Sequence, residues 1–180
     1  ALLPAACLLL PWFVSPEIAA WFSRPRVPRK EELSASDLIY LRRLARRTWL
    51  YFETFVGPGD NWLPPDNVQE APHAAIAHRT SPTNIGMMLL SSLTAWDLGY
   101  VSSADFAARV HNALDSLDRL DRHRGHFLNW YDTQSLEPLE PHYVSTVDSG
   151  NLAVCLLAMK EGFREALSAP AMRREQWDGL

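Results

Sequence analysis

Polar and aromatic side chains of the kinds that bind sugars gather at three places in the sequence. They are residues 78–84 (HRTSPTN), residues 126–132 (HFLNWYD) and residues 145–151 (STVDSGN). Aromatic rings offer an apolar face to the C–H surface of a pyranose, and Asp, Asn, Arg and His supply donors and acceptors for its hydroxyl groups. If the three segments meet in space, the pattern indicates a carbohydrate site.

The candidate site contains carboxylates as well as neutral polar groups. A carboxylic acid can protonate a glycosidic oxygen and a carboxylate can activate water, and their separation sets the stereochemical course. Asp132 and Asp148 are therefore the candidate catalytic residues, with Asp132 the first choice for the acid. The candidate substrate-binding residues are Arg79, Thr80, Asn84, His126, Asn129, Trp130, Tyr131 and Asn151. Trp62 is an alternative ring for stacking on a sugar.

Most of these residues also have a structural explanation. Ser81 and Asp148 stand where helix caps are expected, whatever the function. Arg79 can pair with an internal carboxylate, and Trp130 and Tyr131 can be core aromatics. A purely structural role predicts that the side chains of Trp130 and Asp148 are fully buried and paired.

Several other chemistries lack support. The histidines at positions 73, 78, 123 and 126 do not have metal-motif spacing, so we expect neither a metal nor a cofactor. Neither a glycine-rich phosphate loop nor the G-x-S-x-G of serine hydrolases is present. The net charge of −4 does not favour a protein that binds duplex nucleic acid. Cys7 and Cys155 lie far apart in apolar runs, which indicates buried or lipid-facing thiols.

Apolar periodicity and capping signals predict the elements that must position the polar segments. Helices are expected at residues 34–55, 82–98, 104–122 and 151–167, with a further external helix beginning in the tail. A long ordered loop is expected at residues 60–80 and an extended segment at residues 126–132. The first and third of the four helices are amphipathic and should lie outside, whereas the more apolar second and fourth should lie inside.

Outer and inner helices that alternate along a chain are the pattern of a toroid of nested helical hairpins. An open helical array would share the hairpins, but no repeat of fixed period is visible. We therefore predict an all-α fold that forms part of such a toroid. Because its inner helices begin at the same end, the three polar segments are expected to meet at one mouth of the barrel.

The first 30 residues differ from the rest. ALLPAACLLLPWFVS lacks charge, Trp12 and Trp21 suit a bilayer boundary, and the basic SRPRVPRK follows, as on the cytoplasmic side of a membrane segment. Prolines interrupt the run, and the start signal at residues 15–17 predicts a short helix to about Phe22. We expect the end of a transmembrane, re-entrant or interfacial segment; a buried helix of a soluble domain is the alternative. The sequence opens on Ala inside an apolar run, so we expect a fragment of a longer protein.

Four longer motifs carry a resemblance to a known family. NWLPPDNVQE (61–70), HRTSPTNIG (78–86), RGHFLNWYDT (124–133) and LEPLEPHYVSTVDSGNLA (136–153) resemble the cyclic β-1,2-glucan synthases, large inner-membrane proteins of bacteria. The similarity covers most of the chain. Several long motifs in the same order make the resemblance specific.

The resemblance implies a fold and a domain plan. In that family a membrane-embedded glycosyltransferase region extends a linear β-1,2-glucan from UDP-glucose, and a glucoamylase-like (α/α)6 region is linked to processing and ring closure. Residues 1–30 would then be the end of a transmembrane segment with its basic linker. Residues 31–180 would be the N-terminal half of the glucoamylase-like domain, a partial (α/α)6 toroid with about three helical hairpins.

The resemblance also implies a function. The segment would hold and process a β-1,2-glucan chain, by transglycosylation and cyclisation, within a parent protein in the bacterial inner membrane whose soluble part faces the cytoplasm. Its implied partners are the glucan, the membrane and the remaining domains of the same polypeptide, without nucleic acid, and the isolated fragment is expected to be inactive. Two alternatives stay open: the main catalytic carboxylates can lie downstream, and the segment can be a non-catalytic glucan-binding or scaffold module.

Overall fold

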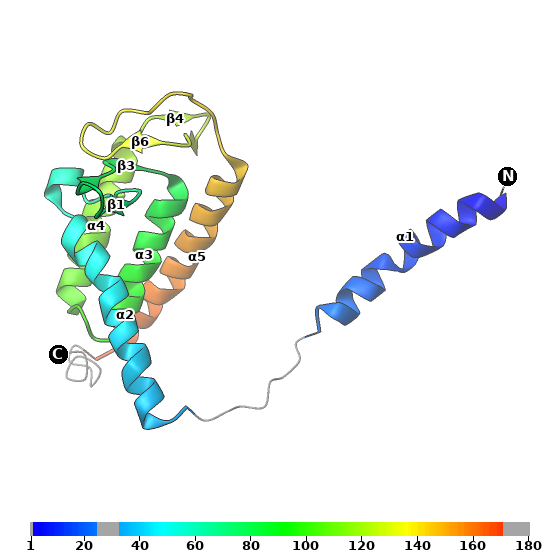
Figure 1. Cartoon of the computed structure of the whole chain (residues 1–180), viewed down its shortest axis with the longest axis horizontal. Helices are drawn as coiled ribbons and strands as arrows, with labels where there is room; N and C mark the ends of the chain where they lie inside the picture. Colours follow the sequence, from blue (N-terminus) through cyan, green and yellow to red (C-terminus); the bar gives the residue numbers. More distant parts are fainter. Residues whose placement is uncertain (1, 25–32, 171–180) are drawn as a thin grey trace. The chain divides into compact units, whose positions relative to one another are not determined.

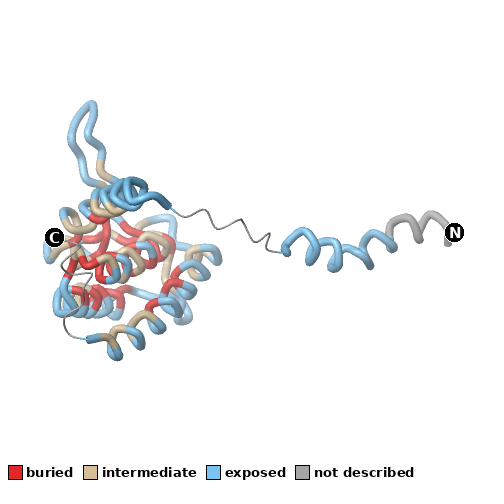
Figure 2. Tube along the Cα trace, turned by 90° about the horizontal axis from the view of Figure 1, so that it is seen from below, coloured by how far each residue is buried: buried red, intermediate tan, exposed pale blue. Residues whose placement is uncertain are grey.

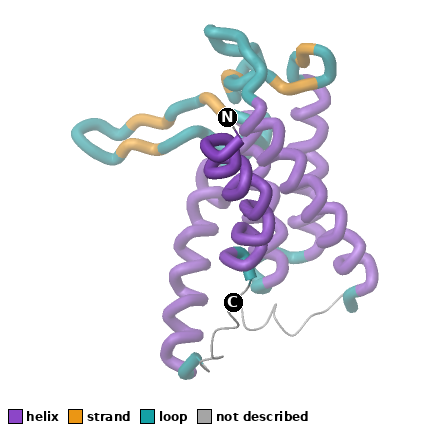
Figure 3. Tube along the Cα trace, turned by 90° about the vertical axis from the view of Figure 1, so that its right-hand side faces the viewer, coloured by secondary structure: helices purple, strands orange, loops and turns teal. Residues whose placement is uncertain are grey.

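The computed structural model describes residues 2–24 and 33–170, and helices dominate it (Figure 3). The helices are α1 (Leu2–Phe22), α2 (Ala35–Phe55), α3 (Pro82–Asp97), α4 (Ser103–Arg119) and α5 (Thr146–Ser168), with a 3-10 turn, η1 (Pro58–Asp60). Three antiparallel pairs of two-residue strands join β1 (Val68–Gln69) to β2 (Ala75–Ile76), β3 (Arg79–Thr80) to β6 (Tyr131–Asp132) and β4 (Arg122–His123) to β5 (His126–Phe127). The mostly helical fold is the one expected. Residues 25–30 of the basic linker and residues 171–180, where the tail helix was expected, lie outside the described residues.

Helix α1 belongs to a first unit, residues 1–38. The expectation of a short helix over residues 15–22 was wrong, because α1 is continuous through its internal prolines. Pro16 has no N–H to donate to the carbonyl of Trp12, but the hydroxyl of Ser15 donates to that oxygen at 2.8 Å. The serine thus replaces a bond that proline removes.

The large apolar side chains of α1 are exposed. Trp12 is 81% exposed, Phe13 85% and Phe22 75%. Among the described residues, no helix combines the length and the apolar character needed to cross a bilayer. The expected end of a transmembrane segment is therefore not confirmed.

The second unit, residues 39–180, holds the core, which is drawn in red between the helices in Figure 2. Helix α3 is buried along most of its length, whereas α4 buries one stripe through Phe106, Val110 and Leu117. This confirms the expected inner position of α3 and outer position of α4. The stripe on α4 follows helical periodicity, so its polar face meets solvent.

Helix α5 departs from expectation in two ways. It begins at Thr146 instead of residue 151, because the hydroxyl of Ser145 accepts a hydrogen bond from the Asp148 N–H and caps the helix. It is also only partly internal. Val154 is 66% exposed and Leu157 63%, since no described element covers that face.

Helices α3 and α5 pack side by side and run in the same direction, as Figure 1 shows in green and orange. Near their first turns, the hydroxyl of Thr83 donates a hydrogen bond to Asp148. Towards their far ends, Leu93 packs against Gly162. Corresponding positions therefore meet in order along both helices, and the two helices begin at the same end of the unit.

The close approach of the two helices depends on Gly86. A Cβ atom added there would lie 2.9 Å from Sγ of Cys155 and 3.4 Å from the backbone Cα of Leu152. The thiol of Cys155 is buried, as expected, and burial raises its pKa. A side chain at position 86 would therefore push α5 away from α3.

We predict that Gly86→Ala lowers the free energy of unfolding by about 1–3 kcal/mol, the cost of overpacking a tight contact. Gly150→Ala is the matched control, because Gly150 lies in α5 and a Cβ added there meets nothing within 4 Å. The control should be neutral or stabilising by up to about 1 kcal/mol. Urea unfolding of the two variants measures the difference, and equal midpoints would contradict the tight contact.

Candidate functional site

The strand pair β3–β6 joins the first polar segment to the second at the start of α3. Arg79 lies opposite Asp132 in antiparallel register. Strand β3 leads directly into α3, where the hydroxyl of Ser81 caps the helix by accepting from the N–H of Asn84 at 3.2 Å. The pairing therefore holds residues 126–132 beside the first turn of an inner helix.

The third polar segment joins through Thr83. Its hydroxyl donates to the carboxylate of Asp148, and the amide of Asn151 donates to the same hydroxyl oxygen at 3.1 Å. Asp148 lies in the first turn of α5. The structure thus brings the three segments together at one end of the second unit, where the strands and loops lie in Figure 1.

Contacts and strand pairing there link Asp66, Arg79, Asn84, Trp130 and Asp132, which we call the rim cluster. Asp66 is at its centre: Oδ2 accepts from Nη2 of Arg79 at 2.9 Å and from Nε at 3.2 Å, and Oδ1 accepts from Asn84 at 3.3 Å. The guanidinium group of Arg79 lies over the indole of Trp130, 5.0 Å from the ring centroid. The cluster is thus a preformed network of a cation, a carboxylate, an amide and an aromatic ring, with Asp132 opposite Arg79 on the paired strand.

Two hollows flank the rim cluster. A groove of about 660 Å³ is lined by Arg79 and Asp132 together with the polar side chains of Asn67, Gln69, His78 and Gln134. A second hollow of about 310 Å³ is lined by Asp66 and Asn84 with Tyr51, Pro64, Pro65 and Met87. The Asp66–Arg79 pair connects them, so a ligand in either hollow lies beside the cluster.

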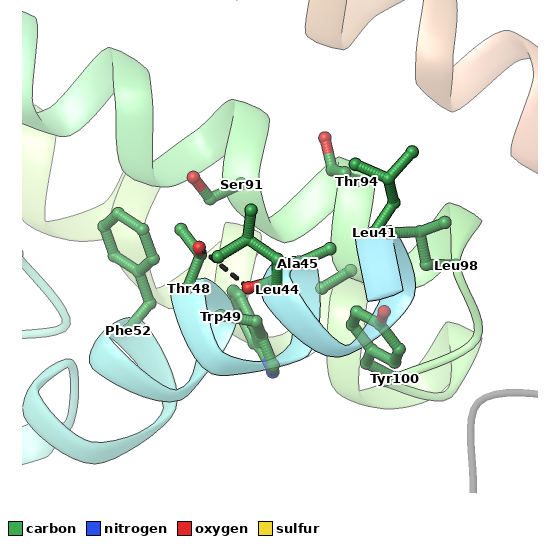
Figure 4. A pocket seen from close by; sticks show the side chains of 11 residues that line it. Leu41, Leu44, Ala45, Thr48, Trp49, Phe52, Ser91, Thr94, Leu98 and Tyr100 are labelled. Atoms are coloured by element: carbon green, nitrogen blue, oxygen red, sulfur yellow. Dashed lines mark hydrogen bonds between the residues drawn. The ribbon is translucent and has the colours of Figure 1, made fainter. Parts of the chain in front are cut away.

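A third hollow, of about 320 Å³, has a different character (Figure 4). It lies between α2 and α3 and is lined mainly by apolar side chains such as Leu41, Leu44 and Phe52. The hydroxyl of Thr48 is already bonded to the carbonyl of Leu44 at 3.0 Å. A sugar needs several donors and acceptors, so this hollow does not suit one.

Asp132 is held in a tight turn. One of its oxygens, Oδ1, accepts from the backbone N–H of Ser135 at 2.8 Å, from that of Gln134 at 2.9 Å and from the Ser135 hydroxyl at 3.2 Å. These bonds, that of the Ser135 backbone first, lower the pKa of Asp132. A carboxyl group whose ionised form is favoured is poorly suited to donate a proton to a glycosidic oxygen near neutral pH.

The carboxylate of Asp148 accepts fewer described hydrogen bonds than that of Asp132. It is half-buried, and the side-chain bond that the structure describes, from Thr83, occupies only Oδ1. Trp130 is half-buried as well. The purely structural explanation required full burial of Trp130 and Asp148, so it does not fit them.

Three sequence-based candidates are buried. Tyr131 is 0% exposed, and its hydroxyl donates to the carbonyl of Asp121 and accepts from the N–H of Leu128, both at 2.6 Å. Burial raises the pKa of Tyr131. Thr80 is 0% and Asn129 2% exposed. The prediction that Tyr131 stacks on a sugar and that Thr80 and Asn129 contact it is therefore corrected: these side chains pack the loops behind the rim.

His126 and Asn151 have different positions. His126 is exposed in β5 and lies opposite His123 in the β4–β5 hairpin, whose turn has positive φ at Arg124 (52°) and Gly125 (85°). No described contact joins His126 to the rim cluster. Asn151 is exposed and reaches the rim through its bond to Thr83.

The sequence did not single out two residues that organise the site. Asp66 gathers Arg79 and Asn84, and Oδ1 of Asp60 accepts from Nδ1 of His78 at 2.6 Å and from the Thr133 hydroxyl at 2.5 Å. Both lie in the loop of residues 60–80, which has no periodicity to orient its side chains. The signal available was the Pro-Pro pair before Asp66, which restricts the backbone there.

Within the described ranges, no group of three His, Cys, Asp or Glu side chains is arranged to hold a metal ion.

The hydrogen bonds to Asp132 predict a pH dependence of stability. Because its folded-state pKa is lowered, its contribution is present above the unfolded value of about 3.9 and is lost as the pH falls through the folded value. Asp132→Asn should lose less stability than the wild type between pH 7 and pH 2, as followed by urea midpoints. Glu165→Gln, which removes an exposed carboxylate from α5, is the control. Identical pH profiles for the wild type and Asp132→Asn would rule out the lowered pKa.

Comparison with models of known protein families gives no match. Among curated proteins, the cyclic beta-(1,2)-glucan synthase NdvB of Rhizobium meliloti (strain 1021) is 45% identical over 162 residues, which are 89% of this chain and 6% of that protein. Among solved structures, a putative glucoamylase from Bacteroides fragilis NCTC 9343 aligns with a TM-score of 0.61 and 19% identity over 85% of this chain and 36% of that one. The second likeness concerns the fold alone. The sequence similarity shows that the chain belongs to the cyclic β-1,2-glucan synthase family, and the likeness to the solved structure shows that its fold is glucoamylase-like.

Proposed function

We propose that this segment holds a β-1,2-glucan chain at its rim while a membrane-bound parent protein, which makes the chain from UDP-glucose, processes it by transglycosylation and ring closure. The observation that carries the proposal is the convergence of Arg79, Asn84, Trp130 and Asp148 from three distant segments. The name of the curated relative supports the choice of glucan. The chain spans only a small part of that relative.

The rim cluster has the groups that a glucan needs. Asp66, Asn84 and Asp132 supply acceptors and an amide donor for hydroxyl groups, and Arg79 is already oriented by its two bonds to Asp66. The guanidinium group covers one face of Trp130, so a pyranose would stack on the opposite face. The polar groove of about 660 Å³ gives the chain a path past the cluster.

The proposed reaction transfers the glucan chain to its own distal end. An acid protonates the glycosidic oxygen that leaves. The carboxylate that remains then takes the proton of a hydroxyl of the distal glucose as that hydroxyl forms the new bond at the anomeric carbon. Net hydrolysis is avoided where water is excluded from the rim. Within this segment Asp148 suits the acid better than Asp132, because backbone bonds favour the ionised form of Asp132.

The position in the cell is part of the same proposal. The exposed rings of Trp12, Phe13 and Trp21 on α1 suit the boundary of a bilayer, where indoles are enriched. We infer attachment to a bacterial inner membrane with the second unit on the cytoplasmic side. The exposed apolar face of α5, with Val154 and Leu157, is then covered by further domains of the same polypeptide.

A non-catalytic glucan-binding module is the second candidate, and one observation favours it. Asp132, the first candidate for the acid, accepts hydrogen bonds within a turn, and these bonds lower its pKa. In a module the rim cluster would bind the chain, and the essential acid would lie elsewhere in the parent protein.

We predict that Arg79→Ala weakens the binding of linear β-1,2-gluco-oligosaccharides at least about tenfold, because it removes a cation and frees the Asp66 carboxylate. Arg164→Ala is the matched control: Arg164 also pairs with a carboxylate, Glu161, at 2.8 Å, but towards the far end of α5. Isothermal titration calorimetry on the chain measures both affinities. Equal affinities of the two variants for the glucan would contradict a role of the rim cluster in binding it.

A second prediction separates enzyme from module. In the full-length parent, Asp148→Asn should lower the rate of cyclic glucan formation by about 100-fold or more, the scale of a lost acid, whereas Asp132→Asn should change it less than about tenfold. Product analysis of the cyclic fraction gives both rates. Unchanged cyclic product with Asp148→Asn, together with retained binding, would favour the module.

A further inference from the structure

We propose that a cleft between the η1 turn and α4 is a second saccharide-binding site on this chain, with Trp62 as its stacking ring. The inference takes its ligand class, a linear glucan, from the proposed function. The site is separate from the rim groove, since the two share no lining residue.

The cleft has the size and lining of a sugar site. Its volume is about 530 Å³, within the range of roughly 300–1,000 Å³ that is usual for small-molecule sites. It is lined by Trp62 together with Asn112, Asp115, Asp118 and Arg119. A ring surrounded by carboxylates, an amide and a guanidinium group matches the alternating apolar and hydroxyl-bearing surfaces of a pyranose.

Trp62 is fixed in an uncommon backbone conformation. Asn61 and Trp62 both have positive φ, 50° and 59°, a region that residues other than glycine enter rarely. Three bonds to their backbone hold them there. The Asn61 N–H donates to the carbonyl of Pro58 at 3.3 Å, the Trp62 N–H donates to the carbonyl of Gly57 at 2.9 Å, and the Ser116 hydroxyl donates to the carbonyl of Asn61 at 2.5 Å. The ring is thus presented by a rigid support.

The side chain of Asn61 ties this support to the rim. Its amide donates to the carbonyls of Thr133 at 2.9 Å and Gln134 at 2.8 Å, and its oxygen accepts from Nη2 of Arg119 at 3.0 Å. Gln134 also lines the rim groove. Gln134 therefore links the rim groove to the support of Trp62.

The carboxylates of the cleft are available to a ligand. Asp115 pairs with His111 at 3.4 Å and Asp118 with Arg122 at 3.3 Å, and the aspartate side chains are 62% and 83% exposed. Exposed pairs of this kind contribute little, so sugar hydroxyls can replace them. The same carboxylates disfavour a polyanion such as a nucleic acid.

The test uses the chain labelled with 5-fluorotryptophan, whose ¹⁹F resonances for Trp62 and Trp130 are assigned by Trp62→Phe and Trp130→Phe. On titration with linear β-1,2-gluco-oligosaccharides, the Trp62 resonance should shift saturably in the wild type and in Arg79→Ala. Asn112→Ala should weaken this response at least about fivefold while the free resonance stays in place, which shows that the variant is folded.

The outcomes distinguish the two proposals. If Trp130 responds and Trp62 does not, the cleft is not a site and the proposed function stands. If Trp62 responds but loses its response in Arg79→Ala, the cleft is not separate and the inference is overturned. If Trp62 alone responds, the cleft is supported and the rim proposal fails, and if neither responds both fail.

Discussion

The close packing of α3 against α5 is the constraint on which the site depends. Gly86 has no side chain, so the backbone of α5 at Leu152 and the thiol of Cys155 come against it. With the helices in this contact and running the same way, Thr83 and Asp148 can share a hydrogen bond at the common end. If the helices were further apart or reversed, the same polar residues would lie in separate places and no shared site would form.

The loops above the helices are organised by the end of the η1 turn. Asp60 bonds to His78 and Thr133, whereas Asn61 bonds to the carbonyls of Thr133 and Gln134. Two adjacent residues thus fix strand β3, the loop after β6 and, through Arg119, helix α4. This explains how a region of short strands can hold a rim cluster with defined geometry: its rigidity comes from side chains that bond to the backbone of distant loops.

The sequence predicted the helices and the convergence of the polar segments, because both follow from periodicity. Apolar spacing located α2, α3 and α4 within a few residues. It failed for α1, since the pattern does not show that Ser15 can satisfy the carbonyl left by Pro16. It started α5 late, at residue 151, whereas the cap at Ser145 starts the helix at Thr146.

Within the candidate site, the type of a residue did not predict whether its side chain is buried or available to a ligand. Trp130 and Tyr131 are adjacent aromatics, yet the first is half-buried beside Arg79 and the second is fully buried with its hydroxyl bonded to loop backbone. Alternation along an extended strand sends neighbours to opposite sides, and one sequence does not reveal which side faces the ligand. Asp66 was missed for a related reason, because its partners come from β3 and α3 through long-range contacts.

Cross-linking of α3 to α5 tests the shared end most directly. Cysteines introduced by Thr83→Cys and Asp148→Cys, with the native cysteines replaced, should form a disulfide readily under mild oxidation, because the two side chains are in hydrogen-bond contact. A pair at Leu93→Cys and Asp148→Cys should not form one. Efficient cross-linking of the second pair and none of the first would contradict helices that begin at the same end, and with it the common site.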